Sequence, residues 1–243
     1  ANGDFQANVY ISGFKNAVKA IVEIQTLSGK TESKFETAAN APVCNISGKM
    51  VNPKTWNPES PNLYNTVFKL LDKNGMVINQ YSERIGFRTV EVRESDGIYV
   101  NGVRIKMQGV CRHTFNPKYG RTSSKSLSIE AVNLMKDMNM NAVRMSHYPP
   151  DKHFLDVCDS LGLVVLDELT AWQKPSYDDV VGRKLLEEMI AHDVNHPSII
   201  LWDNGNEGGE NNNLNDDFAE LDIQKRKVLH PWQDYDLTNT LHY

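Results

Sequence analysis

The chain has 243 residues, of which 40% are hydrophobic and 23% are charged, and its formal net charge is −5. This composition is ordinary for a soluble globular protein with an apolar core, and the length fits one large domain or two smaller ones. The negative charge gives no electrostatic basis for binding nucleic acid or an anionic membrane, and the apolar runs are too short to span a bilayer.

The first part of the chain alternates in the manner of β-strands. Val18, Ala20, Val22 and Ile24 fall on one side of a predicted strand, and mostly polar residues lie between them. Ser28-Gly29 and Asn74-Gly75 are turn signals, and the second predicts a hairpin with arms at 66–70 and 77–81. Several short strands separated by turns predict an antiparallel sandwich, with no helix of convincing length before residue 120.

The apolar period becomes helical after residue 120. Apolar residues recur every third position from Ile129 to Met138 and predict a first helix, with Ser126 or Ser128 as its N-cap. A second helical stripe covers 154–161, where Gly162 has the position of a C-cap glycine. Further stripes predict helices at 185–190 and at 214–228.

Short apolar runs alternate with these helices and predict strands. They cover 105–110, 142–145, 163–166 and 199–202, and a fifth is expected to start near Leu241. Alternating strands and helices indicate βαβ units and a parallel sheet. A closed barrel of eight such strands usually needs about 250 residues of its own, so we expect only about half of one here.

The strand at 199–202 leads directly into an acidic loop. His196-Pro197 closes the preceding segment, because a residue before proline is disfavoured in helical geometry. Glycines and asparagines at 203–209 predict a sharply bent loop that contains Glu207. Barrel enzymes place their catalytic groups at the C-terminal ends of such strands, which favours a catalytic Glu207 over an ordinary solvated loop acid.

Several motifs, in order along the chain, resemble one enzyme family. His196 to Trp202 followed by Gly205-Asn206-Glu207 closely resembles the acid/base signature of glycoside hydrolase family 2, which includes β-galactosidases, β-glucuronidases and β-mannosidases. Similar matches occur at 56–64, 86–88, 101–102, 109–113, 141–149 and 158–168. The resemblance implies a multidomain β and α/β protein. An immunoglobulin-like β-sandwich would cover 1–92, and the first half of a (β/α)8 TIM barrel, about four βα units, would cover 93–243.

The resemblance implies roles for residues at the ends of the predicted strands. Glu207 would be the acid/base, whose pKa should be raised towards neutrality because it must both donate and accept a proton. Asn206 would bond the 2-hydroxyl of the sugar, unless it only caps the loop. Further substrate contacts would come from Arg112, His147, Trp172 and His242.

Structural alternatives remain for several of these residues. Arg112 and His147 could instead form internal ion pairs that brace the top of the barrel, and Trp172 could anchor its loop. Glu168 would support the site, as its counterpart does in the family, without acting on substrate. Family members that bind magnesium use an acid and a histidine in the loop after the third strand. Residues 169–174 offer neither, so no metal and no cofactor are predicted.

The implied reaction is hydrolysis of a terminal β-linked sugar with retention, and residues 204–209 favour the β-galactosidase type. Retention needs two carboxylates about 5–5.5 Å apart. The nucleophile of the family lies on a later strand, so we expect it beyond Tyr243 and expect the isolated chain to be inactive. The alternative is a catalytically inactive carbohydrate-binding or structural module.

A carbohydrate is the expected partner, and an open half-barrel is expected to associate with a second copy. Its exposed interior would be lined by Val143, Val165, Ile199 and Leu201. Cys44, Cys111 and Cys158 form no metal-ligand pattern and predict free thiols. No signal peptide is visible, and the compartment stays open, with the periplasm and the cell exterior included for the full-length protein.

Overall fold

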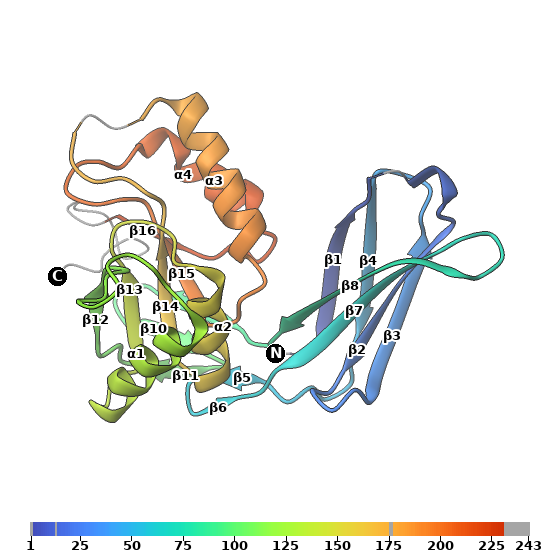
Figure 1. Cartoon of the computed structure of the whole chain (residues 1–243), viewed down its shortest axis with the longest axis horizontal. Helices are drawn as coiled ribbons and strands as arrows, with labels where there is room; N and C mark the ends of the chain where they lie inside the picture. The colour runs from blue at the N-terminus through green and yellow to red at the C-terminus, as the bar shows by residue number, and fades with distance from the viewer. Residues whose placement is uncertain (1, 13, 175–176, 231–243) are drawn as a thin grey trace. The chain divides into compact units, whose positions relative to one another are not determined.

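The computed structural model describes residues 2–12, 14–174 and 177–230, which form two compact units. The first unit consists of Ala1–Trp56 with Asn62–Phe87, and the second of Asn57–Pro61 with the chain from Arg88 onward. Within the described residues, α-helices occur only in the second unit (Figure 1). The predicted change from a β pattern to an α/β pattern along the chain is therefore confirmed.

The first unit is an antiparallel sandwich of two sheets (Figure 1). One sheet pairs β1 (Asp4–Tyr10) with β4 (Val43–Lys49). The other has the order β3-β2-β7-β8, formed by Thr31–Ala38, Lys19–Gln25, Tyr64–Leu71 and Val77–Ile85. A shorter element of this unit is the 3₁₀ turn η1 (Phe14–Asn16), and the two-residue strands β5 (Trp56–Asn57) and β6 (Ser60–Pro61) pair where the chain passes into the second unit and back.

Apolar side chains from both sheets meet between them. Ala20 and Val22 of β2 pack in one cluster with Cys44 and Ile46 of β4. Val18 is 48% exposed and precedes the strand, which begins at Lys19, so its inclusion in the predicted strand was wrong. The predicted hairpin at Asn74-Gly75 is confirmed between β7 and β8.

The second unit is built on a parallel sheet in chain order, β12-β13-β14-β15-β16. Its strands are Gly109–Arg112, Ala142–Met145, Val164–Glu168, Ile199–Asp203 and Val228–Leu229. Each strand pairs in parallel with the next, which is the arrangement of successive strands in a TIM barrel. The half-barrel fold is thus confirmed, whereas the strand expected near Leu241 lies outside the described residues.

Two strand predictions need correction. Val103–Ile105 forms β11 of a separate antiparallel sheet with β10 (Gly97–Val100) and β9 (Val90–Arg93), so the first barrel strand starts at Gly109 instead of residue 105. Val228 was predicted to be helical, but it pairs with Trp202 as part of β16. The helix before it ends early because Asp222 turns the chain by accepting hydrogen bonds from the backbone of Gln224 and Arg226.

Four α-helices alternate with the parallel strands: α1 (Lys125–Asp137), α2 (Lys152–Leu161), α3 (Asp179–Asp193) and α4 (Asn215–Leu221), the last after the 3₁₀ turn η2 (Asn212–Leu214). Ser124 caps α1 by accepting from the backbone of Leu127, so the predicted caps at Ser126 and Ser128 were wrong. Ser128 is instead buried in the helix. Gly162 ends α2 in the left-handed conformation, as predicted.

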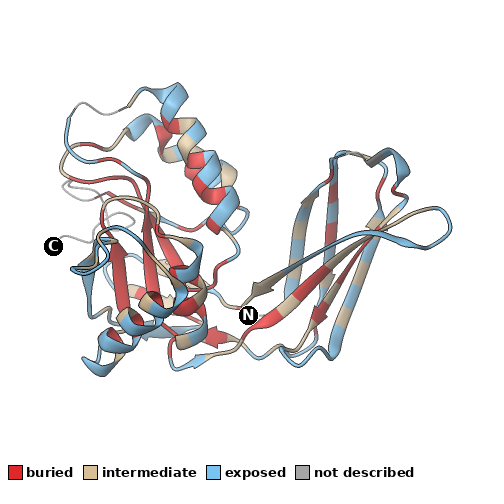
Figure 2. Cartoon of the chain, in the orientation of Figure 1, coloured by how far each residue is buried: buried red, intermediate tan, exposed pale blue. Residues whose placement is uncertain are grey.

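The helices cover one face of the parallel sheet, in which β13, β14 and β15 are buried throughout (Figure 2). Val143, Val165 and Ile199 belong to the same cluster as Phe154 of α2 and Leu186 of α3. These three residues therefore face the helices, and the prediction that they line an open barrel interior was wrong. Side chains alternate along a strand, and Arg144, Leu166 and Glu168 take the opposite face. Association with a second copy stays a prediction.

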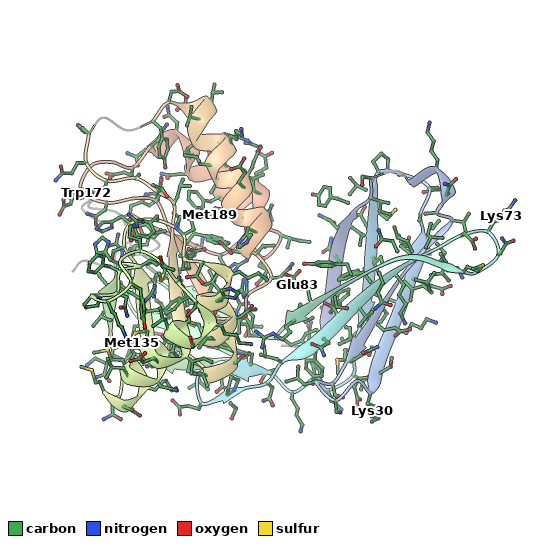
Figure 3. The ribbon with its side chains drawn as sticks, viewed as in Figure 1. Lys30, Lys73, Glu83, Met135, Trp172 and Met189 are labelled. Atoms are coloured by element: carbon green, nitrogen blue, oxygen red, sulfur yellow. The ribbon has the colours of Figure 1, made fainter. Side chains whose placement is uncertain are left out.

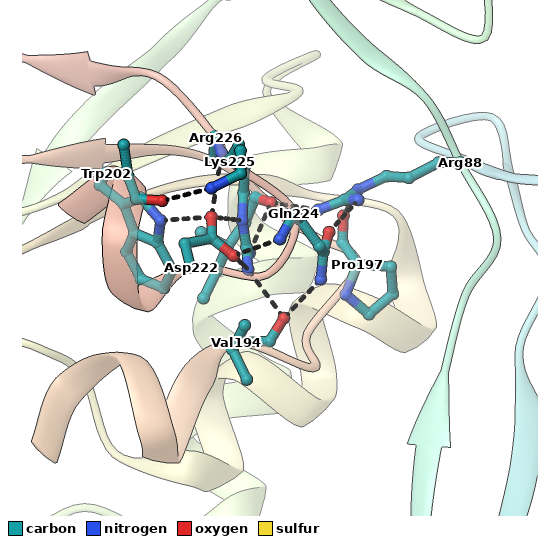
Figure 4. A network of polar contacts seen from close by, with 10 residues as sticks. Arg88, Val194, Pro197, Trp202, Asp222, Gln224, Lys225 and Arg226 are labelled. Atoms are coloured by element: carbon teal, nitrogen blue, oxygen red, sulfur yellow. Dashed lines mark hydrogen bonds and ion pairs between the residues drawn. The ribbon is translucent and has the colours of Figure 1, made fainter. Parts of the chain in front are cut away.

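Two arginines bind the start of β15 (Figure 4). Arg88 donates from Nε to the Pro197 carbonyl and from a terminal nitrogen to the Ile199 carbonyl, both at 2.5 Å. Arg226 donates to the Val194 carbonyl at 2.8 Å and pairs with Asp222. Burial and the charge of Arg226 lower the pKa of Arg88 to about 9, so it remains a cation at pH 7. Arg88, where the chain enters the second unit, is thereby bound to a strand that lies more than a hundred residues later.

Among the described residues, none of the helices combines the length and the apolar character that crossing a membrane requires.

We expect Gly162→Ala to destabilise the second unit strongly. Gly162 has a φ of +73°, and an added Cβ would lie 2.0 Å from the Pro58 carbonyl oxygen. The left-handed conformation alone costs about 1–2 kcal/mol, and the clash adds to it. Gly120→Ala is the matched control, because Gly120 has a φ of +62° with open space around it. Urea unfolding should show the larger loss at Gly162, and equal losses would contradict the clash.

Candidate active site

Glu207 lies in the tight loop that follows β15. Its φ is +51°, and the flanking Gly205 and Gly208 have φ values of +78° and +80°. A Cβ at Gly205 would lie 2.6 Å from that of Ala171, so the glycine lets this loop approach the loop after β14. The sequence Gly-Asn-Glu-Gly thus places Glu207 at the C-terminal end of the parallel sheet.

The loops after β14 and β15 are hydrogen-bonded to each other. The backbone N–H of Asn206 donates to the Ala171 carbonyl at 2.8 Å, and the backbone N–H of Gln173 donates to the backbone carbonyl of Asn206 at 3.1 Å. This pairing extends the sheet beyond the ends of its strands as an isolated parallel bridge between Trp172 and Asn206. Two residues predicted for the site, Asn206 and Trp172, are thereby brought together beside Glu207.

The Glu207 carboxylate accepts two side-chain hydrogen bonds. The Trp172 indole donates to its Oε2 at 2.8 Å, and the side-chain amide of Gln173 donates to the same oxygen at 3.2 Å. Both bonds stabilise the charged form and lower the pKa of Glu207, with Trp172 as the larger cause. The raised pKa expected for an acid/base is therefore not found in this chain. Trp172 itself projects outward from the loop and is 62% exposed (Figure 3).

His147 joins this group from the end of β13. Its ring stacks on the Trp172 indole with centroids 6.3 Å apart, and its Nδ1 lies 2.8 Å from Oε1 of Glu168. His113 packs edge-on against it at 5.4 Å. Burial and the charge of Arg144 lower the pKa of His147, which favours the neutral ring. His147 thus lies at the C-terminal end of the parallel strands and contacts a buried acid there, and its contact with substrate stays a prediction.

Arg144 is the centre of the buried part of the site, a role that its place in the sequence did not predict. Its Nε lies 2.5 Å from Asp203, and a terminal nitrogen lies 2.7 Å from Glu168. The same nitrogen lies 3.3 Å from the Asn206 side-chain oxygen and 3.4 Å from the Gly205 carbonyl. The available signal was an arginine inside the otherwise apolar strand 142–145.

Glu168 and Asp203 are both fully buried. Burial raises the pKa of each carboxyl, the charge of Asp203 raises that of Glu168 further, and Arg144 opposes both shifts. One guanidinium therefore compensates two acids that water does not reach. Glu168 is committed to Arg144 and His147, which agrees with its predicted supporting role.

Arg112 is not brought into this group. Its guanidinium lies over the Phe154 ring of α2, 4.1 Å from the centroid, and donates to the Thr114 hydroxyl at 3.3 Å. Residues alternate along β12, so Arg112 turns towards the helices. Cys111 turns towards Glu168, whose pKa it raises. His113, the next residue, is the one that contacts His147, and a substrate contact of Arg112 stays a prediction. His242 lies outside the described residues.

A separate polar cluster lies at the other end of β15. Asp159 accepts from the backbone and the hydroxyl of Ser198 at 3.0 and 2.6 Å, and it contacts Nδ1 of His196 at 2.6 Å. Asp156 lies close enough to form a possible cation-binding set with them. These contacts tie α2 to the start of the strand, and Glu207 lies beyond its opposite end.

The structure thus places a glutamate, preceded by an asparagine, at the end of a parallel barrel strand, with a histidine and an exposed tryptophan beside it. Residues 90–228 match the family model described as "Glycosyl hydrolases family 2, TIM barrel domain", and residues 1–88 match that of "Glycosyl hydrolases family 2". The chain belongs to glycoside hydrolase family 2.

Relatives and solved structures agree with this assignment. A beta-galactosidase of Lactococcus lactis is 34% identical over 80% of this chain, and a putative beta-glucuronidase of Formosa agariphila is 34% identical over 81%. The chain spans about a fifth of the length of these relatives. The structure of a beta-glycosidase from Bacteroides vulgatus matches with a TM-score of 0.82 at 29% identity, and the match covers 94% of this chain and 33% of that protein's chain.

We expect Trp172→Phe to raise the pKa of Glu207, because it removes the stronger hydrogen bond to the carboxylate while keeping an aromatic ring beside His147. Gln173→Ala should produce a smaller rise in the same direction. The measurement is a carbon-13 NMR titration of the Glu207 side chain. Trp202→Phe, which alters an indole bonded to Asp222, is the control. A pKa unchanged by Trp172→Phe would contradict this account.

Asp167 should make the free energy of unfolding fall as pH rises. This carboxyl is buried on the helix-facing side, and burial together with the charge of Asp193 raises its pKa well above the ordinary value. Unfolded aspartate ionises near about pH 3.9, so the folded state is penalised progressively above that pH. Asp167→Asn should therefore gain at least about 1 kcal/mol relative to the unsubstituted chain between pH 5 and pH 8.

Urea unfolding at both pH values measures this difference. Glu188→Gln, at an exposed carboxylate of α3, is the control and should shift stability equally at the two pH values. A gain for Asp167→Asn that does not depend on pH would contradict the linkage.

Proposed function

We propose that this chain forms the acid/base half of the active site of a retaining β-glycosidase that hydrolyses terminal β-linked sugars. The observation that carries the proposal is the position of Glu207, at the C-terminal end of β15 and directly after Asn206, in a chain of glycoside hydrolase family 2. Glu207 protonates the leaving oxygen and later removes a proton from water. Asn206 bonds the 2-hydroxyl, and the exposed Trp172 face stacks on the sugar ring.

The low pKa of Glu207 is compatible with this role once a second carboxylate is added. A nucleophile about 5–5.5 Å away would repel the Glu207 charge and raise its pKa. Substrate that displaces the Trp172 indole from the carboxylate would raise it further. Glu168 and Asp203 do not supply the nucleophile, since both are buried against Arg144. We assign that role to a glutamate on a later strand of the full-length protein.

A β-galactoside is the proposed substrate. The sequence of residues 204–209 favours this type, and a β-galactosidase is among the relatives with the highest similarity. A putative beta-glucuronidase is equally similar, so galactosides and glucuronides should be compared directly with the full-length protein. A strong preference for glucuronides would overturn the substrate and leave the reaction class in place.

In the full-length protein, Glu207→Gln should slow hydrolysis most for substrates with poor leaving groups. Loss of a general acid typically costs 10²–10⁴-fold, and activated aryl glycosides need little protonation, so they should lose less. Steady-state kinetics with aryl glycosides of graded leaving-group pKa measures the effect. Glu187→Gln, at an exposed carboxylate paired with Arg183, is the control. Equal losses across the series would show that Glu207 is not the acid.

The isolated chain should hydrolyse no nitrophenyl β-galactoside at a measurable rate, because Glu168 and Asp203, the acids beneath Glu207, are held by Arg144. Turnover above a heat-inactivated sample, abolished by Glu207→Gln, would contradict this expectation. Retained sugar binding by the full-length protein without turnover would favour the alternative of an inactive carbohydrate-binding module.

A further inference from the structure

Asp203 has no part in the proposed reaction, yet it lies within the site. It is the last residue of β15, it is fully buried, and its carboxylate lies 2.5 Å from Nε of Arg144. A second acid beside Glu168 adds a desolvation cost that a neutral residue would avoid. Its ion pair with Arg144 offsets that cost, so what the aspartate contributes to the site depends on where it holds the guanidinium.

Different nitrogens of the Arg144 guanidinium contact Asp203 and the loop that leads to Glu207. Asp203 occupies Nε, and a terminal nitrogen reaches Glu168 at 2.7 Å, the Asn206 side chain at 3.3 Å and the Gly205 carbonyl at 3.4 Å. The guanidinium is planar, so a carboxylate at Nε fixes the direction of the whole group. Without it, the guanidinium could rotate towards Glu168 and leave the loop.

We propose that Asp203 is a positioning residue of this site. By fixing the Arg144 guanidinium it holds Gly205 and Asn206 in place, and it thereby sets the position of the Glu207 carboxylate against the Trp172 indole. The inference deepens the proposed function and depends on it only for the chemical role of Glu207, because the position of the carboxylate can be measured without substrate.

Two routes of contact connect Arg144 with Glu207. The first passes through Asn206, the residue directly before Glu207 in the chain. The second passes from Glu168 to His147, which stacks on Trp172 and so on the indole that binds Glu207. Asp203→Asn removes the charge that anchors the first route and leaves the second in place. Its effect should be a displaced carboxylate in a chain that remains folded.

The test is the indole N–H signal of Trp172 in nitrogen-15 correlation NMR spectra of the chain, assigned by its loss in Trp172→Phe. In Asp203→Asn, we expect this signal to shift towards that of a free indole and its exchange with water to accelerate several-fold. The indole of Trp202, which donates to Asp222 at 2.9 Å, is the internal control and should not shift. Asp167→Asn is the matched variant, since Asp167 is equally buried on the opposite face of the sheet.

An unchanged Trp172 signal in folded Asp203→Asn would overturn the proposal, as would an equal shift in Asp167→Asn. Asp203→Ser, which is smaller and also uncharged, is the second variant if Asp203→Asn does not fold. Loss of the folded spectrum in both variants would also overturn it, because Asp203 would then be required for folding and not for position. An active full-length Glu207→Gln enzyme would refute the proposed function and leave this measurement unaffected.

Discussion

The site depends on one buried guanidinium placed between two buried carboxylates. Arg144 contacts Glu168 and Asp203 from neighbouring strands, and it also reaches the loop that contains Asn206. Charges removed from water are tolerated only when they are paired and hydrogen-bonded, so the three strands must keep the register that brings these groups together. The same constraint fixes the loop that presents Glu207, and the geometry of the exposed site follows from the buried pair beneath it.

The parallel strands serve two purposes on their two faces. Val143, Met145 and Val165 pack against the helices, and this apolar layer provides the hydrophobic stabilisation of the unit. Arg144 and Glu168 alternate with them and point to the other face, where they form the polar site. A shift of one residue in register would turn the apolar residues towards the site and the polar residues towards the helices. The two faces of a short strand therefore remain distinct even though both are buried.

Glu207 differs in its surroundings from the acids behind it. Glu168 and Asp203 have raised pKa values because they are buried, whereas two side-chain donors lower the pKa of the partly exposed Glu207. A partly exposed carboxylate held by two neutral donors can respond to a neighbouring charge or a sugar. The acids beneath it are buried and paired with Arg144, so their surroundings suit support of the site.

The sequence by itself determined the two-part architecture, the Asn74-Gly75 hairpin, the end of α2 at Gly162 and the position of Glu207 after a buried strand, because these features depend on local periodicity and turn chemistry. It also indicated Asn206 and His147 through the family motifs, and Trp172 because an aromatic ring in this loop suits a sugar. The tertiary structure decided which face each strand residue takes. It turned Arg112 towards Phe154, made Val228 a strand residue and gathered Arg144, Glu168 and Asp203. Those outcomes depend on strand register and on contacts between residues up to sixty positions apart, which a local pattern does not encode.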